Sequence, residues 1–86
     1  MYKLLYSPQA QKDAKKLATS GLKKKAEYLL ELIEKNPYSY PPEYEFLRGR
    51  LEGFISRRIN KQHRLVYEVL EKGKIIKIIR MWTHYE

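Results

Sequence analysis

The hydrophobic pattern of this chain changes from a helical to a strand period after residues 38–44, and that change constrains the fold more than any other feature. From about Leu22 to Lys35 the apolar residues follow the i, i+3, i+4, i+7 spacing of a helix with one buried face; they are Ala26, Leu29, Leu30 and Ile33. The later pattern alternates as in strands, over Phe54–Ile59, His63–Leu70 and Lys74–Trp82. Together with an earlier helix that precedes Leu22, this order predicts an α+β domain with two helices packed on one face of an antiparallel sheet.

Local signals set the first boundaries. Residues 2–6 are apolar and aromatic and predict a short strand. Ser7-Pro8 is typical of a helix start, because a serine hydroxyl can cap the first turn and proline is favoured at the first helical position. We expect this helix to end near Ala18, since Thr19-Ser20-Gly21 favours a turn.

A proline- and tyrosine-rich segment separates the two halves. Asn36-Pro37 stops the second helix, and Tyr38–Tyr44 is too short and too aromatic to be a flexible tether. We therefore expect a loop inside one domain that spans residues 1–86, with a weak strand at Glu45–Arg48. Glu71-Lys72-Gly73 predicts a tight hairpin turn between the last two strands.

Composition limits the kind of protein. A chain of 86 residues is long enough for one domain with a modest core, and an apolar content of 43% favours a globular protein. Without cysteine, neither disulfides nor thiolate metal sites hold the fold. No apolar run approaches membrane-spanning length, and the apolar stretch at residues 1–6 is too short for the hydrophobic region of a signal peptide. We therefore expect a soluble cytoplasmic protein.

The net charge of +8 is unevenly distributed. Residues 1–47 carry 8 basic and 6 acidic side chains, whereas residues 48–80 carry 10 basic and 3 acidic ones. A basic half of this kind indicates a polyanionic partner or an acidic protein that masks it. A solvated basic surface without a partner is the alternative.

The arginines of the basic half fall on predicted strands. Strand alternation places Arg58 on one face with Ser56, and Arg57 on the opposite face. Arg64 starts the next strand, and pairing of the two strands can bring Arg58 and Arg64 to a common open face of the sheet. The alternative is that both are strand arginines facing solvent.

The C-terminal His84-Tyr85 adds groups suited to RNA chemistry. Arginine holds phosphate in a fork, imidazole moves protons near neutral pH, and a phenol ring can stack on a base. Neither histidine lies in a metal-ligand motif, so we expect no metal and no cofactor. We interpret His63 as structural and Trp82 as a core or interface residue.

Three motifs resemble one known family. The run Gly53–Ile59 (Gly-Phe-Ile-Ser-Arg-Arg-Ile), the run His63–Tyr67 (His-Arg-Leu-Val-Tyr) and the His84-Tyr85 end are similar to those of the YoeB/Txe toxins of the RelE/ParE superfamily. Glu45–Arg48 is similar to that family's Glu-Pro-Leu-Lys, and the resemblance extends over most of the chain. It implies a RelE-like, microbial-ribonuclease-like fold and the toxin of a type II toxin–antitoxin system.

The resemblance also implies an activity and residue roles. Family members are mRNA interferases, metal-independent endoribonucleases that enter the ribosomal A site, cut mRNA and so inhibit translation. Carried over by position, Glu45 is the general base, Arg64 stabilises the phosphate and His84 is the general acid. The supporting substrate-binding residues are Arg48, Arg58 and Tyr85.

The chain departs from the family pattern at three positions. Arg48 stands where lysine is common, Ile55 replaces a tryptophan, and Glu86 follows the His-Tyr that often ends the chain. We expect Glu86 to modulate activity without abolishing it.

The resemblance implies partners as well. They are a YefM/Phd-type antitoxin with an acidic tail, the ribosome with its mRNA, and a second copy of the chain, to which exposed aromatics such as Tyr44 and Trp82 would contribute. Two other functions stay open: a non-catalytic RNA- or ribosome-binding module, and a gyrase-directed, ParE-like toxin.

Overall fold

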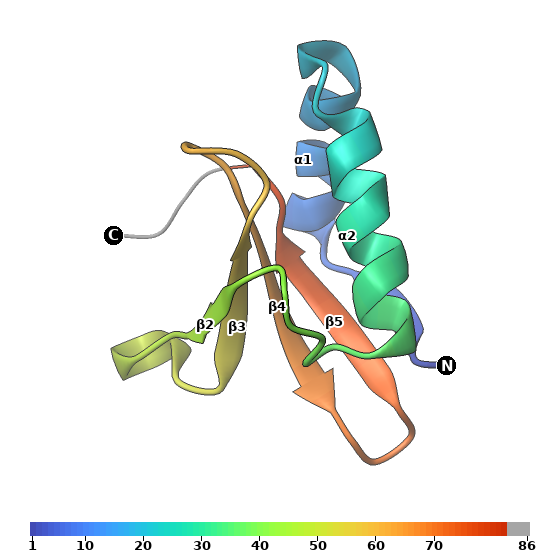
Figure 1. The fold of residues 1–86 in the computed structure, drawn as a ribbon, viewed down its shortest axis with the longest axis vertical. Coiled ribbons are helices and arrows are strands. Elements are labelled where there is room, and N and C mark those ends of the chain that lie inside the picture. Colours follow the sequence, from blue (N-terminus) through green and yellow to red (C-terminus); the bar gives the residue numbers. More distant parts are fainter. Residues whose placement is uncertain (83–86) are drawn as a thin grey trace.

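The computed structural model describes residues 1–82, which form two α-helices and a five-stranded sheet (Figure 1). Both helices lie on one side of the sheet, as the change of period predicts. In chain order the elements are β1 (Lys3–Tyr6), α1 (Pro8–Ser20), α2 (Lys23–Lys35), β2 (Tyr44–Phe46), the 3₁₀ turn η1 (Gly49–Leu51), β3 (Phe54–Arg58), β4 (Arg64–Leu70) and β5 (Ile75–Arg80).

Helix α1 begins where the sequence predicts but runs two residues further. Ser7 Oγ accepts a hydrogen bond from the amide of Ala10 (2.9 Å), with Pro8 at the first helical position. The hydroxyls of Thr19 and Ser20 donate to carbonyls one turn back, so these residues stay helical. The helix ends at Gly21, whose φ of 83° is the left-handed conformation that glycine favours. Within residues 1–82, neither α1 nor α2 is long and apolar enough to cross a membrane.

The strands form one sheet in the order β1-β5-β4-β3-β2. Pairing is antiparallel from β5 through β2, whereas β1 joins the edge of the sheet parallel to β5. The sequence predicted an antiparallel sheet but not the direction of β1, because the long connection through two helices permits either direction. The weak strand expected at residues 45–48 is present as β2, one residue earlier and shorter.

Side-chain contacts explain where two strands stop. Between β3 and β4 the Asn60 carboxamide oxygen accepts hydrogen bonds from the amides of Gln62 and His63, which closes a turn. Strand β3 therefore ends at Arg58, one residue before the predicted Ile59, and β4 begins at Arg64, one residue after the predicted His63. At the end of β5 the Met81 amide donates to the buried carboxylate of Asp13 on α1 (2.9 Å), so the strand does not continue to Trp82.

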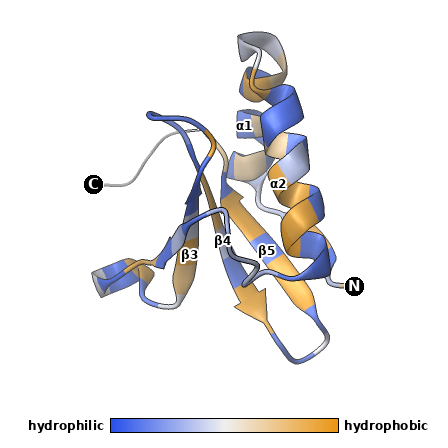
Figure 2. Cartoon of the chain, viewed as in Figure 1, coloured by the Kyte–Doolittle hydropathy of each residue, from blue (hydrophilic) through white to orange (hydrophobic). Residues whose placement is uncertain are grey.

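The core lies between the helices and the sheet. Hydrophobic residues gather on α2, β4 and β5 where these elements face one another (Figure 2). The buried side chains that form this core cluster are Ala10, Leu17, Ala26, Leu29, Ile33, Ile55, Ile59, Leu65, Tyr67, Ile76, Ile78 and Met81. The four residues that predicted the buried stripe of α2 behave as expected: three are buried and Leu30 packs against them.

Two predictions about aromatic residues had different outcomes. His63 is structural, as predicted: its ring is buried and stacks on that of Trp82, with centroids 3.9 Å apart. The expectation that Tyr44 and Trp82 are exposed is wrong, because both are half-buried. Trp82 packs on His63, and Tyr44 lies against the guanidinium of Arg57.

Candidate active site

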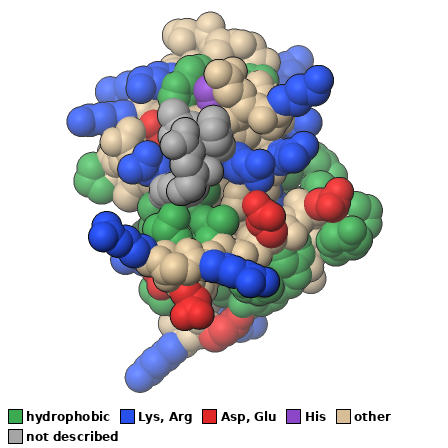
Figure 3. Space-filling view, turned by 90° about the vertical axis from the view of Figure 1, so that its left-hand side faces the viewer, with side chains coloured by type: hydrophobic (Ala, Val, Ile, Leu, Met, Phe, Trp, Pro, Cys, Tyr) green, Lys and Arg blue, Asp and Glu red, His purple; other side chains and the backbone are tan. Residues whose placement is uncertain are grey.

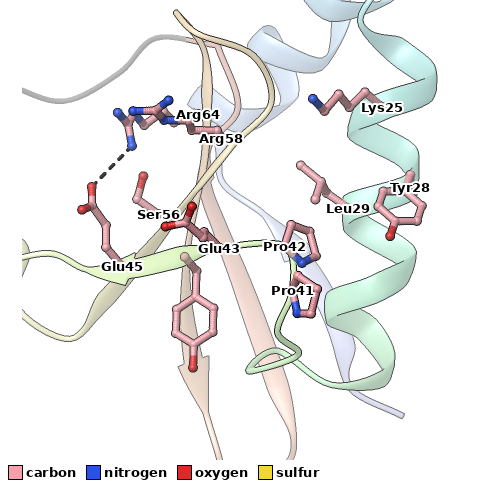
Figure 4. A pocket seen from close by; sticks show the side chains of 11 residues that line it. Lys25, Tyr28, Leu29, Pro41, Pro42, Glu43, Glu45, Ser56, Arg58 and Arg64 are labelled. Carbon is pink, nitrogen blue, oxygen red and sulfur yellow. Dashed lines mark hydrogen bonds and ion pairs between the residues drawn. The ribbon is translucent and has the colours of Figure 1, made fainter.

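A cavity of about 660 Å³ opens between α2 and the β2–β3–β4 part of the sheet (Figure 4). The sequence predicted that the arginines lie on an open face of the sheet, but α2 and the proline-rich loop form one wall of the cavity. The side chains that line it are Lys25, Tyr28 and Leu29 on α2, Pro41, Pro42 and Glu43 in the loop, Tyr44 and Glu45 at β2, Ser56 and Arg58 on β3, and Arg64 on β4.

The register of the sheet brings the predicted residues together. Glu45 pairs with Ser56 across β2 and β3, and Arg58 pairs with Arg64 across β3 and β4. The prediction that Arg58 and Arg64 share a face is confirmed, since both line the cavity. Arg57 points the other way, also as predicted, and its side chain is buried.

An ion pair joins Glu45 and Arg64 inside the cavity. Arg64 Nη1 lies 3.3 Å from Glu45 Oε1, and the side chains are 21% and 63% exposed, respectively. An ion pair this open to water contributes only about 0–1 kcal/mol. It therefore orients the two groups without locking them, and an incoming phosphate can compete for the guanidinium.

Arg57 holds the loop that walls the cavity. Its guanidinium donates to the carbonyl oxygens of Pro42 (2.6 Å), Ser39 (2.8 Å) and Pro37 (3.1 Å), while Nε donates to the Tyr67 hydroxyl (3.0 Å). A buried cation is tolerated when it is paired or hydrogen-bonded in this way. Burial raises the pKa of Tyr67, and the adjacent guanidinium acts in the opposite direction.

The sequence predicted the direction of Arg57 but not its role. An arginine on the core-facing side of a strand needs several acceptors, and a nearby proline-rich segment can provide carbonyls free of regular pairing. That combination was the available signal. Lys25 and Tyr28 were also missed as site residues, because only the tertiary fold brings α2 to the cavity. Ser56 was placed on the face of Arg58 but was not recognised as a site residue.

Of the remaining predicted site residues, the structure describes Arg48, which does not line the cavity. Its side chain is exposed, and it precedes η1, beyond the end of β2, without a capping hydrogen bond from its side chain. His84 and Tyr85 lie outside the described residues. Within residues 1–82, no group of three or more histidine or acidic side chains is arranged to hold a metal ion.

The surroundings of the site are mainly basic. Seen from the side of β2 and β3, lysine and arginine side chains are spread across the surface with acidic side chains between them (Figure 3). Lys25, Arg58 and Arg64 line the cavity together with Glu43 and Glu45. The cavity can therefore attract a polyanion and still present a carboxylate to it.

This combination defines a small α+β protein with a cation-rich, carboxylate-bearing cavity. The family described as YoeB-like toxins of bacterial type II toxin–antitoxin systems matches residues 6–85, and the chain belongs to this family. It is thus the toxin of a type II system.

Relatives and solved structures agree with this assignment. The chain is 35% identical to the toxin YoeB of Synechocystis sp. over 65 residues, which cover 76% of this chain and 73% of the relative. It superimposes on the YoeB chain of a YoeB–YefM complex from Staphylococcus aureus with a TM-score of 0.82 and 36% identity, covering 99% of each chain. A YoeB dimer from the same organism gives a TM-score of 0.82 at 37% identity and covers 98% of each chain.

Proposed function

We propose that this toxin is a ribosome-dependent endoribonuclease that cuts mRNA in the A site without a metal ion and thereby stops translation in the cytoplasm. The observation that carries the proposal is the Glu45–Arg64 pair in the basic cavity, with Arg58 beside Arg64. Membership of the YoeB family supports the same activity.

The reaction uses the nucleophile that RNA itself carries. Glu45 removes the proton of a ribose 2′-hydroxyl, whose oxygen then attacks the adjacent phosphorus. Arg64 and Arg58 stabilise the negative charge that builds on the phosphoryl oxygens. His84 gives a proton to the 5′-oxygen as the P–O bond breaks, which leaves a 2′,3′-cyclic phosphate and a 5′-hydroxyl.

The open ion pair suits this sequence of events. When a phosphate binds the Arg64 guanidinium, the ion pair with Glu45 breaks, and the Glu45 carboxylate is left beside the bound ribose. A weak, partly exposed pair costs little to open, whereas a buried one would resist substrate binding. Arg48 and Tyr85 complete substrate binding at the edge of the site in this proposal.

The same surface would bind the antitoxin. A YefM-type partner is supported by the YoeB–YefM complex of Staphylococcus aureus, and a second copy of the chain by the YoeB dimer. An acidic antitoxin segment that covers the cavity and orders on binding would neutralise the cations that RNA needs.

The decisive measurement is cleavage of a defined mRNA on a programmed ribosome. Arg64→Ala, Glu45→Gln and His84→Ala should each lower the rate by about 10²–10⁴-fold, the contribution expected of positioned acid–base and charge groups. Lys72→Ala, which removes an exposed cation in the turn after β4, is the matched control and should keep the wild-type rate.

The other functions predict different outcomes. Ribosome binding with no cut mRNA would indicate the non-catalytic binding module. Inhibition of DNA supercoiling without mRNA cleavage would indicate the gyrase-directed toxin. Equal cleavage by the wild type and the three site variants would exclude the assigned chemistry.

A further inference from the structure

One buried hydroxyl in the cavity has no role in the mechanism above. The Ser56 side chain is 98% buried (2% exposed), and its Oγ has no hydrogen-bond partner among the described residues. Most buried side-chain hydroxyls are hydrogen-bonded, because leaving one unpaired costs its desolvation. Ser56 is therefore an exception that requires a physical reason.

The position of Ser56 indicates that reason. It lines the cavity from the middle of β3, directly across from Glu45 on β2 and two residues before Arg58. Figure 4 shows its hydroxyl between the side chains of Glu43 and Glu45, directed toward Arg58 and Arg64. The group that would act as base and the groups that would bind phosphate thus surround the unpaired hydroxyl.

A second donor nearby is unpaired as well. Arg64 Nε is buried and has no hydrogen-bond partner among residues 1–82, although Arg64 Nη1 contacts Glu45. Ser56 and Arg64 line the same cavity, and their two buried donors are together complementary to a ligand with several acceptor oxygens close together. A phosphodiester has that character, since its two non-bridging oxygens share the negative charge.

We propose that Ser56 is a further substrate-binding residue, whose hydroxyl donates a hydrogen bond to a non-bridging oxygen of the scissile phosphate. The proposal rests on the endoribonuclease function above and extends it to one more contact. Arg64 binds the same phosphate, so Ser56 fixes the phosphate between that cation and the Glu45 carboxylate. The hydroxyl, which has no partner among residues 1–82, gains one with the substrate.

Ser56→Ala separates this role from a structural one. A hydrogen bond to a charged group is worth about ten- to a hundredfold in the rate, so the variant should cut mRNA slower by about that factor on the programmed ribosome. Its thermal midpoint should equal or exceed that of the wild type, because the substitution removes an unpaired buried hydroxyl. Ser20→Ala, at the exposed end of α1, is the matched control with the wild-type rate.

A sulfur substitution then locates the contact. Two mRNAs carry a single phosphorothioate of defined configuration at the scissile linkage, one for each non-bridging oxygen. Sulfur accepts hydrogen bonds weakly, so the wild type should cleave one of the two isomers more slowly than the all-oxygen mRNA. Ser56→Ala should lower the cleavage rate of that isomer little further. For the other isomer and the all-oxygen mRNA, Ser56→Ala should lower the cleavage rate by the full factor given above.

The outcomes distinguish the two proposals. If the wild type cuts mRNA, Arg64→Ala does not, and Ser56→Ala keeps the wild-type rate, the role of Ser56 is overturned while the function stands. If Ser56→Ala lowers the cleavage rate of all three mRNAs equally and also has a lower thermal midpoint, the substrate contact of Ser56 is overturned in favour of a structural role. A wild type that cuts none of the mRNAs contradicts the endoribonuclease function itself.

Discussion

At the scale of single residues, adjacent arginines on one strand have opposite environments. Arg57 is buried and bonded to three carbonyls and a phenol, whereas Arg58 is exposed and lines the cavity. Strand alternation alone produces this division, since consecutive side chains point to opposite faces. One guanidinium therefore stabilises the loop, and the next remains free to bind a ligand.

Arg57→Lys should destabilise the fold although it keeps the charge. A lysine ammonium lacks the planar fork that reaches Pro37, Ser39 and Pro42 at once, so we expect the free energy of unfolding to fall by about 2–3 kcal/mol. Urea denaturation measures this. Arg58→Lys is the matched control and should change the free energy by less than about 0.5 kcal/mol. Equal midpoints for the two variants would contradict the role of Arg57.

At the scale of elements, the turn between β4 and β5 binds two segments that are distant in the sequence. Glu71, after β4, accepts hydrogen bonds from the hydroxyls of Tyr2 before β1 (2.9 Å) and Tyr38 after α2 (3.0 Å). These bonds tie the edge strand and the loop after α2 to the β4–β5 hairpin. The loop that contributes Pro41 and Pro42 to the cavity is thus also held at Tyr38, which does not line the cavity itself.

The stability of this junction should depend on alkaline pH. Partial burial, followed by the hydrogen bond to Glu71, raises the pKa of Tyr38 from 10.0 to about 12. The native state thus favours the neutral phenol, and its contribution is complete below pH 10 and is lost as the pH rises toward 12. Tyr38→Phe should therefore be less stable than the wild type at pH 8 and lose less stability between pH 10 and 12.

Urea denaturation at pH 8, 10 and 11.5 tests this expectation. Tyr40→Phe is the control, because its ring is 68% exposed and lies in the same loop. Parallel pH curves for Tyr38→Phe and the wild type would show that the Tyr38–Glu71 bond does not contribute to stability.

At the scale of the whole molecule, a net charge of +8 and a cavity with three cations favour a polyanion. The basic side chains extend across the face of Figure 3, beyond the cavity itself. Binding of RNA to such a surface releases counterions, which makes the affinity depend on salt. The same charge would guide an acidic antitoxin to the site.

Salt dependence measures how many phosphates the protein contacts. The logarithm of the affinity for a 2′-deoxy, uncleavable oligonucleotide should fall linearly with the logarithm of the salt concentration, by about 0.7 per phosphate contacted. Arg58→Ala should reduce the slope by about 0.7, and Lys72→Ala should leave it unchanged. Fluorescence anisotropy provides the affinities. Equal slopes for Arg58→Ala and the wild type would place Arg58 outside the RNA interface.

Features that depend on neighbouring residues could be predicted from the sequence, whereas contacts between distant segments could not. The helix start at Ser7-Pro8, the stripe of α2 and the opposite directions of Arg57 and Arg58 follow from local rules, and each is present in the structure. The direction of β1 and the approach of α2 to the cavity depend on contacts between distant segments. Local patterns carry no information about them.

The sequence by itself determined the α+β class, the opposite faces of Arg57 and Arg58 and the family to which the chain belongs. It permitted the pairing of Arg58 with Arg64, which the register of β3 and β4 then established. Period, capping residues and motifs are local properties, and backbone geometry converts them directly into elements and faces. Only the tertiary structure decided that α2 walls the cavity, that Arg57 holds the loop and that the Ser56 hydroxyl has no partner among residues 1–82. Each of these depends on which distant atoms meet, and packing settles that only when the whole chain has folded.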